Sequence, residues 1–130
     1  MRSKLALVTA LFIAVAPAVS ATPFDGAYDI TPQKCAQEMS DSRRILSGNT
    51  MQVWEGQCEL SNPTSIREMP NAVLYDAACW QEGERYYRRI LLQGLSTLMV
   101  YGNYQLSDLI YSDGGYVAAY VRCPSGTTMY

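Results

Sequence analysis

Side chains that commonly perform acid–base or nucleophilic chemistry are scarce in this chain of 130 residues, which contains no histidine. Without histidine, Ser–His and Cys–His nucleophile pairs and the commonest zinc ligand are excluded. The carboxylates of Glu82 and Glu84 could act as an acid and a base, but they flank a turn glycine, which favours a solvated turn. The sequence also lacks phosphate-binding and dinucleotide-binding glycine motifs. We therefore expect no enzyme activity, no metal and no cofactor.

Tyrosine is the unusual residue type, with ten copies beside two tryptophans. Exposed Tyr and Trp make good protein contacts because they are apolar in body and polar at the tip. Since side chains alternate between the two faces of a strand, some of these residues must point outward. The alternative is that tyrosine, which has a high β-propensity, fills a small β core. The possible binding face that we predict consists of Trp54, Trp80, Arg85, Tyr87 and Arg89.

The densest part of this face is the run in which Arg85, Arg88 and Arg89 adjoin Tyr86 and Tyr87. The alternative is a solvated strand face with the nearby acidic residues as counter-charges.

The four cysteines are Cys35, Cys58, Cys79 and Cys123. An even number in a small exported domain indicates two disulfides. Three pairings are possible, and we favour Cys58–Cys79 and Cys35–Cys123. The first would join an inward-facing strand position to the next strand, and the second would tie an N-terminal helical turn to the last strand. A four-cysteine metal site usually has close C-x2-C pairs, which are lacking here.

The elements that position these residues are predicted to be strands. Glycine-containing turn signals such as Gly48-Asn49, Gln93-Gly94 and Asp113-Gly114-Gly115 recur after residue 47, with apolar and β-branched runs between them. This pattern is typical of a barrel or sandwich. We predict a mainly β fold: a single small antiparallel meander of about eight strands, barrel-like or two-layer. Its last three strands would be Leu95–Tyr101, Tyr104–Ser112 and Tyr116–Cys123.

Two hairpin registers follow from the alternation of side chains. A loop at Glu55-Gly56 would place Val53 opposite Cys58 and would put Met51, Val53, Cys58 and Leu60 on one inward face. A two-residue loop at Glu82-Gly83 would place Tyr75 opposite Ile90 and Asp76 opposite Arg89. A loop one residue longer would instead place Arg88 opposite Asp76.

Two segments read differently. Thr31 can cap a helix with Pro32 in its first turn, and the residues from Gln33 to Met39 could form one or two helical turns. The stretch Asn62–Pro70 contains two prolines, which predicts a long connection between strands.

Residues 1–21 have the pattern of a removable signal peptide. Arg2 and Lys4 precede an apolar stretch from Leu5 to Val19, and Val19-Ser20-Ala21 is a small-x-small cleavage pattern. The stretch is short for a bilayer, which needs about 20 apolar residues; a retained signal anchor is the alternative. We expect a single β domain over residues 22–130, with no membrane span, in the periplasm or secreted.

The charge balance narrows the partner class. Without the signal peptide, 8 basic residues remain against 12 acidic ones, a net charge of −4. Nucleic-acid binding depends on Lys and Arg that neutralise phosphates, so we expect no nucleic-acid partner. A basic envelope or extracellular protein is compatible with this charge.

The chain resembles a group of small exported bacterial proteins. The resemblance rests on Phe24-Asp25-Gly26-Ala27-Tyr28, on Gly56-x-Cys58-x-Leu60-x-Asn62-Pro63, on Leu74-Tyr75-Asp76 with Cys79, on Glu82-Gly83-Glu84 with Arg88-Arg89, and on the terminal Arg122-Cys123. It implies a periplasmic or secreted bacterial domain and supplies no catalytic residues. A further resemblance is to periplasmic lysozyme inhibitors of the small β-barrel type, through the loop Ser112–Tyr116.

Three hypotheses about function follow. The first is a non-enzymatic binding module that contacts another protein through its aromatic face, and inhibition of a hydrolase is its sharper version. The second is a carrier of a small apolar ligand inside a barrel, although the bulky inward residues would fill much of the interior. The third is an enzyme that uses the carboxylates of Glu82 or Asp76.

Overall fold

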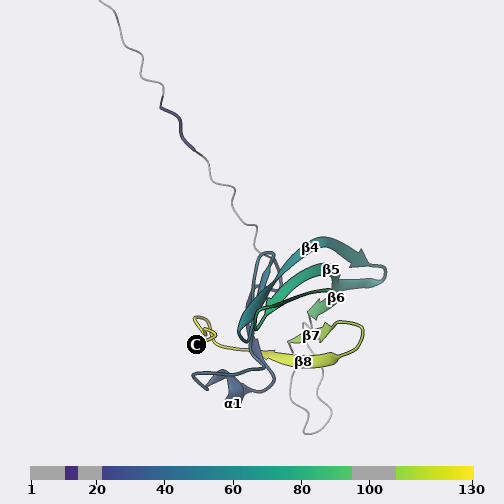
Figure 1. The fold of residues 1–130 in the computed structure, drawn as a ribbon. Helices are drawn as coiled ribbons and strands as arrows, with labels where there is room; N and C mark the ends of the chain where they lie inside the picture. The colour runs from purple at the N-terminus through teal and green to yellow at the C-terminus, as the bar shows by residue number, and fades with distance from the viewer. Residues whose placement is uncertain (1–10, 15–21, 95–107) are drawn as a thin grey trace, which may run out of the picture.

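The computed structural model describes residues 11–14, 22–94 and 108–130. Within them, eight antiparallel strands form a closed barrel in meander order, in which the last strand pairs with the first (Figure 1). The predicted mainly β meander is confirmed, and its form is a barrel. The elements are β1 (Gly26–Asp29), α1 (Pro32–Cys35), β2 (Arg44–Ser47), β3 (Thr50–Val53), β4 (Gly56–Ile66), β5 (Met69–Gln81), β6 (Glu84–Gly94), β7 (Leu109–Ser112) and β8 (Val117–Arg122).

Strand β1 closes the barrel, and the sequence analysis assigned no strand there. Tyr28 pairs with Arg122 of β8 on one side and with Arg44 of β2 on the other. The Arg122 guanidinium lies over the Tyr28 ring, 4.8 Å from its centroid, and donates a hydrogen bond to the carbonyl of Asp25 at 2.6 Å. The Phe24–Tyr28 motif and the terminal Arg122-Cys123 pair therefore lie together where β1 and β8 close the barrel.

The pairing between β3 and β4 is shifted by two residues from the predicted register. Val53 pairs with Gly56 and Met51 with Cys58, so Trp54 and Glu55 form the loop, and Glu55 takes the positive φ of 50°. A shift of two leaves every side chain on its predicted face, and the inward four are buried as expected. Gly56 is the first residue of β4, and glycine is required there because an added Cβ would collide with the Trp80 carbonyl oxygen.

The predicted long connection at Asn62–Pro70 was wrong. Strand β4 continues to Ile66 and returns as β5 from Met69, through a tight turn at Arg67-Glu68. The register between β4 and β5 shifts between Ser61 and Thr64, which forms a β-bulge at Pro63. Pro63 is tolerated because it lacks a backbone N–H and β3 pairs with β4 only as far as Glu59, so the other edge of β4 is unpaired there. The result is a long hairpin that extends beyond the shorter neighbouring strands (Figure 1).

The hairpin of β5 and β6 has the first of the two registers considered, the one with the two-residue loop. Tyr75 pairs with Ile90 and Asp76 with Arg89, across a two-residue loop at Glu82-Gly83. Further along, Gly94 is not a turn residue: it ends β6 and pairs with Leu109. The predicted strand Leu95–Tyr101, the turn at Gly102-Asn103 and the start of the strand predicted at Tyr104 lie outside the described residues, as does most of the predicted signal peptide.

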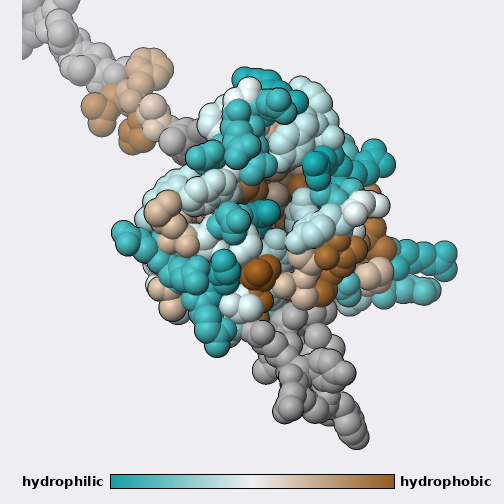
Figure 2. All heavy atoms as spheres, turned by 60° about the horizontal axis from the view of Figure 1, so that its bottom comes forward, coloured by the Kyte–Doolittle hydropathy of each residue, from teal (hydrophilic) through white to brown (hydrophobic). Residues whose placement is uncertain are grey.

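The core fills the middle of the barrel with side chains from the strands. Tyr28, Met51, Ile90, Leu92 and Tyr120 are each at most 2% exposed. No helix in the described parts of the chain has the length and apolar character needed to cross a bilayer. On the face shown in Figure 2 the surface is mostly hydrophilic, and hydrophobic side chains gather at its centre and to the right of it.

Both favoured disulfides are present. Cys58 and Cys79 are directly paired across β4 and β5, and Cys35 at the end of α1 joins Cys123 beyond β8. Helix α1 begins as predicted, with Thr31 accepting a hydrogen bond from the Lys34 N–H at 3.1 Å and Pro32 in the first turn, but it ends at Cys35.

Beside α1, the side chains of Arg43 and Asp29 form a buried ion pair, with Nε and Oδ2 3.3 Å apart and the two side chains 2% and 0% exposed. The other guanidinium nitrogens donate to five backbone carbonyls at 2.7–3.4 Å, those of Lys34, Cys35, Gln37, Glu38 and Thr128. One side chain thus holds both the connection between β1 and β2 and the C-terminal tail.

Candidate functional site

The registers of β3 to β6 place outward side chains in continuous rows across the barrel wall. Gln52 pairs with Gln57, Gln57 with Trp80, and Trp80 with Arg85. The neighbouring row consists of Thr50, Glu59, Ala78 and Tyr87. Since neighbouring strands lie roughly 4.8 Å apart, these four strands make a surface about 14 Å wide.

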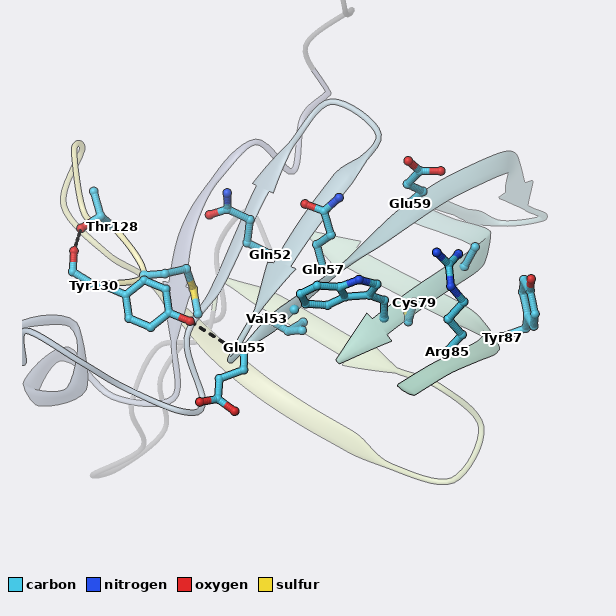
Figure 3. Close-up of a pocket in the computed structure, with 14 residues that line it drawn as sticks. Gln52, Val53, Glu55, Gln57, Glu59, Cys79, Arg85, Tyr87, Thr128 and Tyr130 are labelled. Atoms are coloured by element: carbon cyan, nitrogen blue, oxygen red, sulfur yellow. Dashed lines mark hydrogen bonds between the residues drawn. The ribbon is translucent and has the colours of Figure 1, made fainter. Parts of the chain in front are cut away.

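A groove of about 1010 Å³ lies over these rows (Figure 3). Its floor is formed by the first row and by the second row except Thr50, and residues Thr128–Tyr130 of the C-terminal tail form one side. The side chains of Arg85 and Tyr87 lie at the opposite end from Tyr130 in Figure 3. Trp80 is 47% exposed and Tyr87 is 81% exposed, so this floor presents aromatic surface to solvent.

The tail is held in place through three of its residues, Thr128, Met129 and Tyr130. The Tyr130 ring packs on the Trp54 ring at a centroid distance of 5.5 Å, and its hydroxyl accepts a hydrogen bond from the Glu55 N–H at 3.2 Å. Met129 is 6% exposed, and the Thr128 carbonyl accepts the hydrogen bond from Arg43. The wall of the groove is therefore an ordered part of the fold.

The structure brings together four of the five residues of the predicted binding face. Trp80, Arg85 and Tyr87 line the groove, and Trp54 supports its tail wall. Arg89 also points outward but lies one row further along. Its Nε is 3.2 Å from Asp76 Oδ1, and Asp76 also accepts a hydrogen bond from Asn62. The hydrogen bonds from Asn62 and Arg89 lower the pKa of the Asp76 carboxyl.

Arg88, in the middle of the predicted arginine patch, points the other way. Its Nη1 lies 2.6 Å from Asp113 Oδ2, and its guanidinium covers the Tyr86 ring at 4.8 Å. Burial raises the pKa of the Asp113 carboxyl, but the Gly115 N–H, Arg88 and the Tyr111 hydroxyl together outweigh it and lower that pKa below its usual value. The same burial, with Asp113 nearby, raises the pKa of Tyr111.

The Arg88–Asp113 pair predicts an acid-sensitive contribution to stability. Because the folded state lowers the pKa of the Asp113 carboxyl, the contribution is complete above the unfolded value of about 4 and is lost as the pH falls through the folded value. The urea midpoint should therefore fall less between about pH 7 and pH 2.5 in Asp113→Asn than in the wild type. Glu68→Gln, at a carboxylate 83% exposed, is the matched control and should follow the wild type. Parallel losses in Asp113→Asn and the wild type would contradict this prediction.

The groove is lined by charged, amide and aromatic side chains. Its charged lining residues are Glu55, Glu59 and Arg85, which gives a net charge of −1. Among residues 11–14, 22–94 and 108–130, no three His, Cys, Asp or Glu side chains are close enough to hold a metal ion. Amide, carboxylate and aromatic groups arranged in this way can stack on, and hydrogen-bond to, a partner's side chains.

The sequence predicts the residues of the groove floor but not the tail that forms its wall. The alternation that predicts Met51, Val53, Cys58 and Leu60 on the inward face leaves Gln52, Gln57 and Glu59 on the outer face, and the register agrees. The tail carried one local signal: a turn at Pro124–Thr127, in which the Thr127 N–H donates to the Pro124 carbonyl at 3.2 Å and Gly126 has a φ of 85°. That turn predicts a change of direction but not the surface on which the tail settles.

Comparison with known proteins found no matching family model, no matching curated protein and no matching solved structure.

Proposed function

We propose that this protein is an exported, non-enzymatic binding module of the cell envelope that contacts another protein through the outer groove. The observation that carries the proposal is the alignment of Trp80, Arg85 and Tyr87 in two adjacent rows, open to solvent and bounded by the packed Tyr130. Large aromatic and arginine side chains dominate the energetics of protein interfaces. The two disulfides are typical of proteins that fold in an oxidising compartment.

The partner that fits the groove is a basic loop of another protein. Glu55 and Glu59 give the groove a net negative charge, and the chain from residue 22 onward has a net charge of −4. An Arg or Lys side chain of the partner could lie over Trp80 or Tyr87 as a cation–π contact while it pairs with a carboxylate. Opposite charges also accelerate the encounter of the two proteins.

The sharper form of the proposal is inhibition of a basic hydrolase. A loop of such an enzyme that lies at its active site would be covered when it enters the groove. In this form the protein would reduce the activity of a basic lysozyme, and Tyr87→Ala would weaken that inhibition, with little effect on its own stability because the side chain is 81% exposed.

Site-specific photo-crosslinking in the native envelope tests the contact surface. A photoreactive residue at position 87 should give an adduct of discrete mass. The same residue at position 39 should not, because Met39 lies outside the groove, and it is a fair control because Met39 is 53% exposed. Arg85→Ala should reduce the adduct at position 87 about tenfold or more if the arginine is an interface anchor. Arg67→Ala is the matched control, since Arg67 is 94% exposed on the hairpin turn.

Two results would count against this function. One is the same set of adducts from positions 87 and 39, which would show only random encounters. The other is an adduct at position 87 whose yield does not respond to Arg85→Ala.

A further inference from the structure

A second hollow lies inside the barrel, at the end where the turns at Trp54-Glu55 and Glu82-Gly83 and the loop from Asp113 to Tyr116 meet. These connections share one end because successive connections in an antiparallel meander alternate between the two ends. The cavity has a volume of about 150 Å³. Its polar lining comprises Arg44, Gln81, Tyr86, Arg88, Tyr111 and Asp113, with Tyr116 beside them.

The charges around this cavity do not balance. Arg88 is neutralised by Asp113 at 2.6 Å. Arg44 is half-buried, and its Nη1 donates to the backbone carbonyls of Arg43 at 2.9 Å and Asp41 at 3.2 Å. Within the described part of the chain, no carboxylate lies within 4.0 Å of the Arg44 guanidinium nitrogens. A partly buried guanidinium without an anionic partner is costly, so this position favours an anion.

We infer that the cavity at this end of the barrel binds a small organic carboxylate, which pairs with Arg44. A planar guanidinium matches a carboxylate with two parallel hydrogen bonds. A cavity of about 150 Å³ holds a molecule about the size of benzene, and the rings of Tyr86, Tyr111 and Tyr116 line this one. The ligand enters past the rim, where Tyr116 is 54% exposed and the Arg88 side chain is 50% exposed.

This ligand differs from the apolar one considered from the sequence. The middle of the barrel is filled by buried side chains such as Met51 and Ile90, and the space that remains at this end carries an excess positive charge. The inference is also independent of the groove, because Arg44 and Arg88 line the barrel interior, whereas Trp80 and Tyr87 lie on its outer surface.

Titration of the full domain with benzoate, followed by amide chemical shifts in ¹H–¹⁵N NMR spectra, tests the site. Saturable shifts are expected at the inward positions of β2 and β6 and at the loop after β7. Benzyl alcohol, which has the same ring without the charge, should bind about tenfold or more weakly, since charge-assisted hydrogen bonds are the stronger ones. Arg44→Gln should weaken benzoate binding by a similar factor, and Arg67→Gln, with the same change in net charge, should leave it unchanged.

The comparison of the two ligands uses the wild type alone, so it remains decisive if Arg44→Gln fails to fold. The inference is overturned if benzoate moves no amide around the cavity, if benzyl alcohol binds as tightly as benzoate, or if a folded Arg44→Gln protein binds benzoate with unchanged affinity.

Discussion

Replacing Arg43 by methionine is expected to lower the free energy of unfolding by about 3–5 kcal/mol, the usual cost of removing one partner of a buried ion pair. The substitution leaves the fully buried Asp29 carboxylate without its counter-charge. It also leaves five backbone carbonyls without their donor, those of Lys34, Cys35, Gln37, Glu38 and Thr128. Urea unfolding followed by circular dichroism measures the loss.

Two further variants separate the charge from the hydrogen bonds. In many proteins, replacing both members of a buried ion pair by apolar residues restores stability. Here the double variant Asp29→Leu/Arg43→Met should remain destabilised, because the carbonyls that Arg43 satisfied stay unpaired. Arg67→Met, at a side chain 94% exposed, should change stability by no more than about 0.5 kcal/mol. A cost below about 1 kcal/mol for Arg43→Met would contradict the role assigned to this residue.

Removal of the Cys35–Cys123 disulfide is expected to have the second large effect. The bridge closes a sequence separation of 88 residues, for which chain entropy gives a stabilisation of about 4–5 kcal/mol. The Cys58–Cys79 bridge spans 21 residues and is worth about 3 kcal/mol on the same basis. Serine pairs at each bridge, compared by urea unfolding, should therefore differ by roughly 1 kcal/mol.

The Cys35–Cys123 variant should also loosen the groove wall, because Cys123 is the covalent anchor just before the tail. The fluorescence of Trp54, which packs on Tyr130, should change in this variant under native conditions and should not change in the Cys58–Cys79 variant. Equal responses in the two variants would show that the tail is held independently of its disulfide.

The sequence predicted the face of the strand on which a side chain lies better than it predicted the positions of the turns. The inward and outward sets of β3 and β4 were predicted correctly, although the loop was placed one residue too late, because a register shift of two preserves the side-chain alternation. For β5 and β6 the sequence left two registers open, which differ by the loop length, and the structure has the one with the two-residue loop and Asp76 opposite Arg89. Prolines misled the prediction at Asn62–Pro70, where a bulge and an unpaired strand edge tolerate them.

The candidate site was predicted in part for the same reason. Alternation along a strand reports which residues point outward, and so it identified Trp80, Arg85 and Tyr87. It carries no information about segments that meet only in three dimensions. The tail wall depends on Arg43 and Thr128, which are 85 residues apart in sequence. The same alternation predicts the split of the arginine patch, since neighbours such as Arg88 and Arg89 face opposite sides of one strand, but the patch was grouped by closeness in sequence.

The pairing of β1 with β8 also bears on how the molecule folds. The ladder between Tyr28 and Arg122 joins residues separated by most of the domain, as do the Cys35–Cys123 bridge and the bond from Arg43 to Thr128. Contacts of such high sequence separation slow folding, because the chain must close a long loop before they form. The hairpins of β3 to β6 are local and can form earlier. Until β8 pairs with β1, the nascent sheet has two unpaired edges, at β1 and β8, which are open to pairing with another chain.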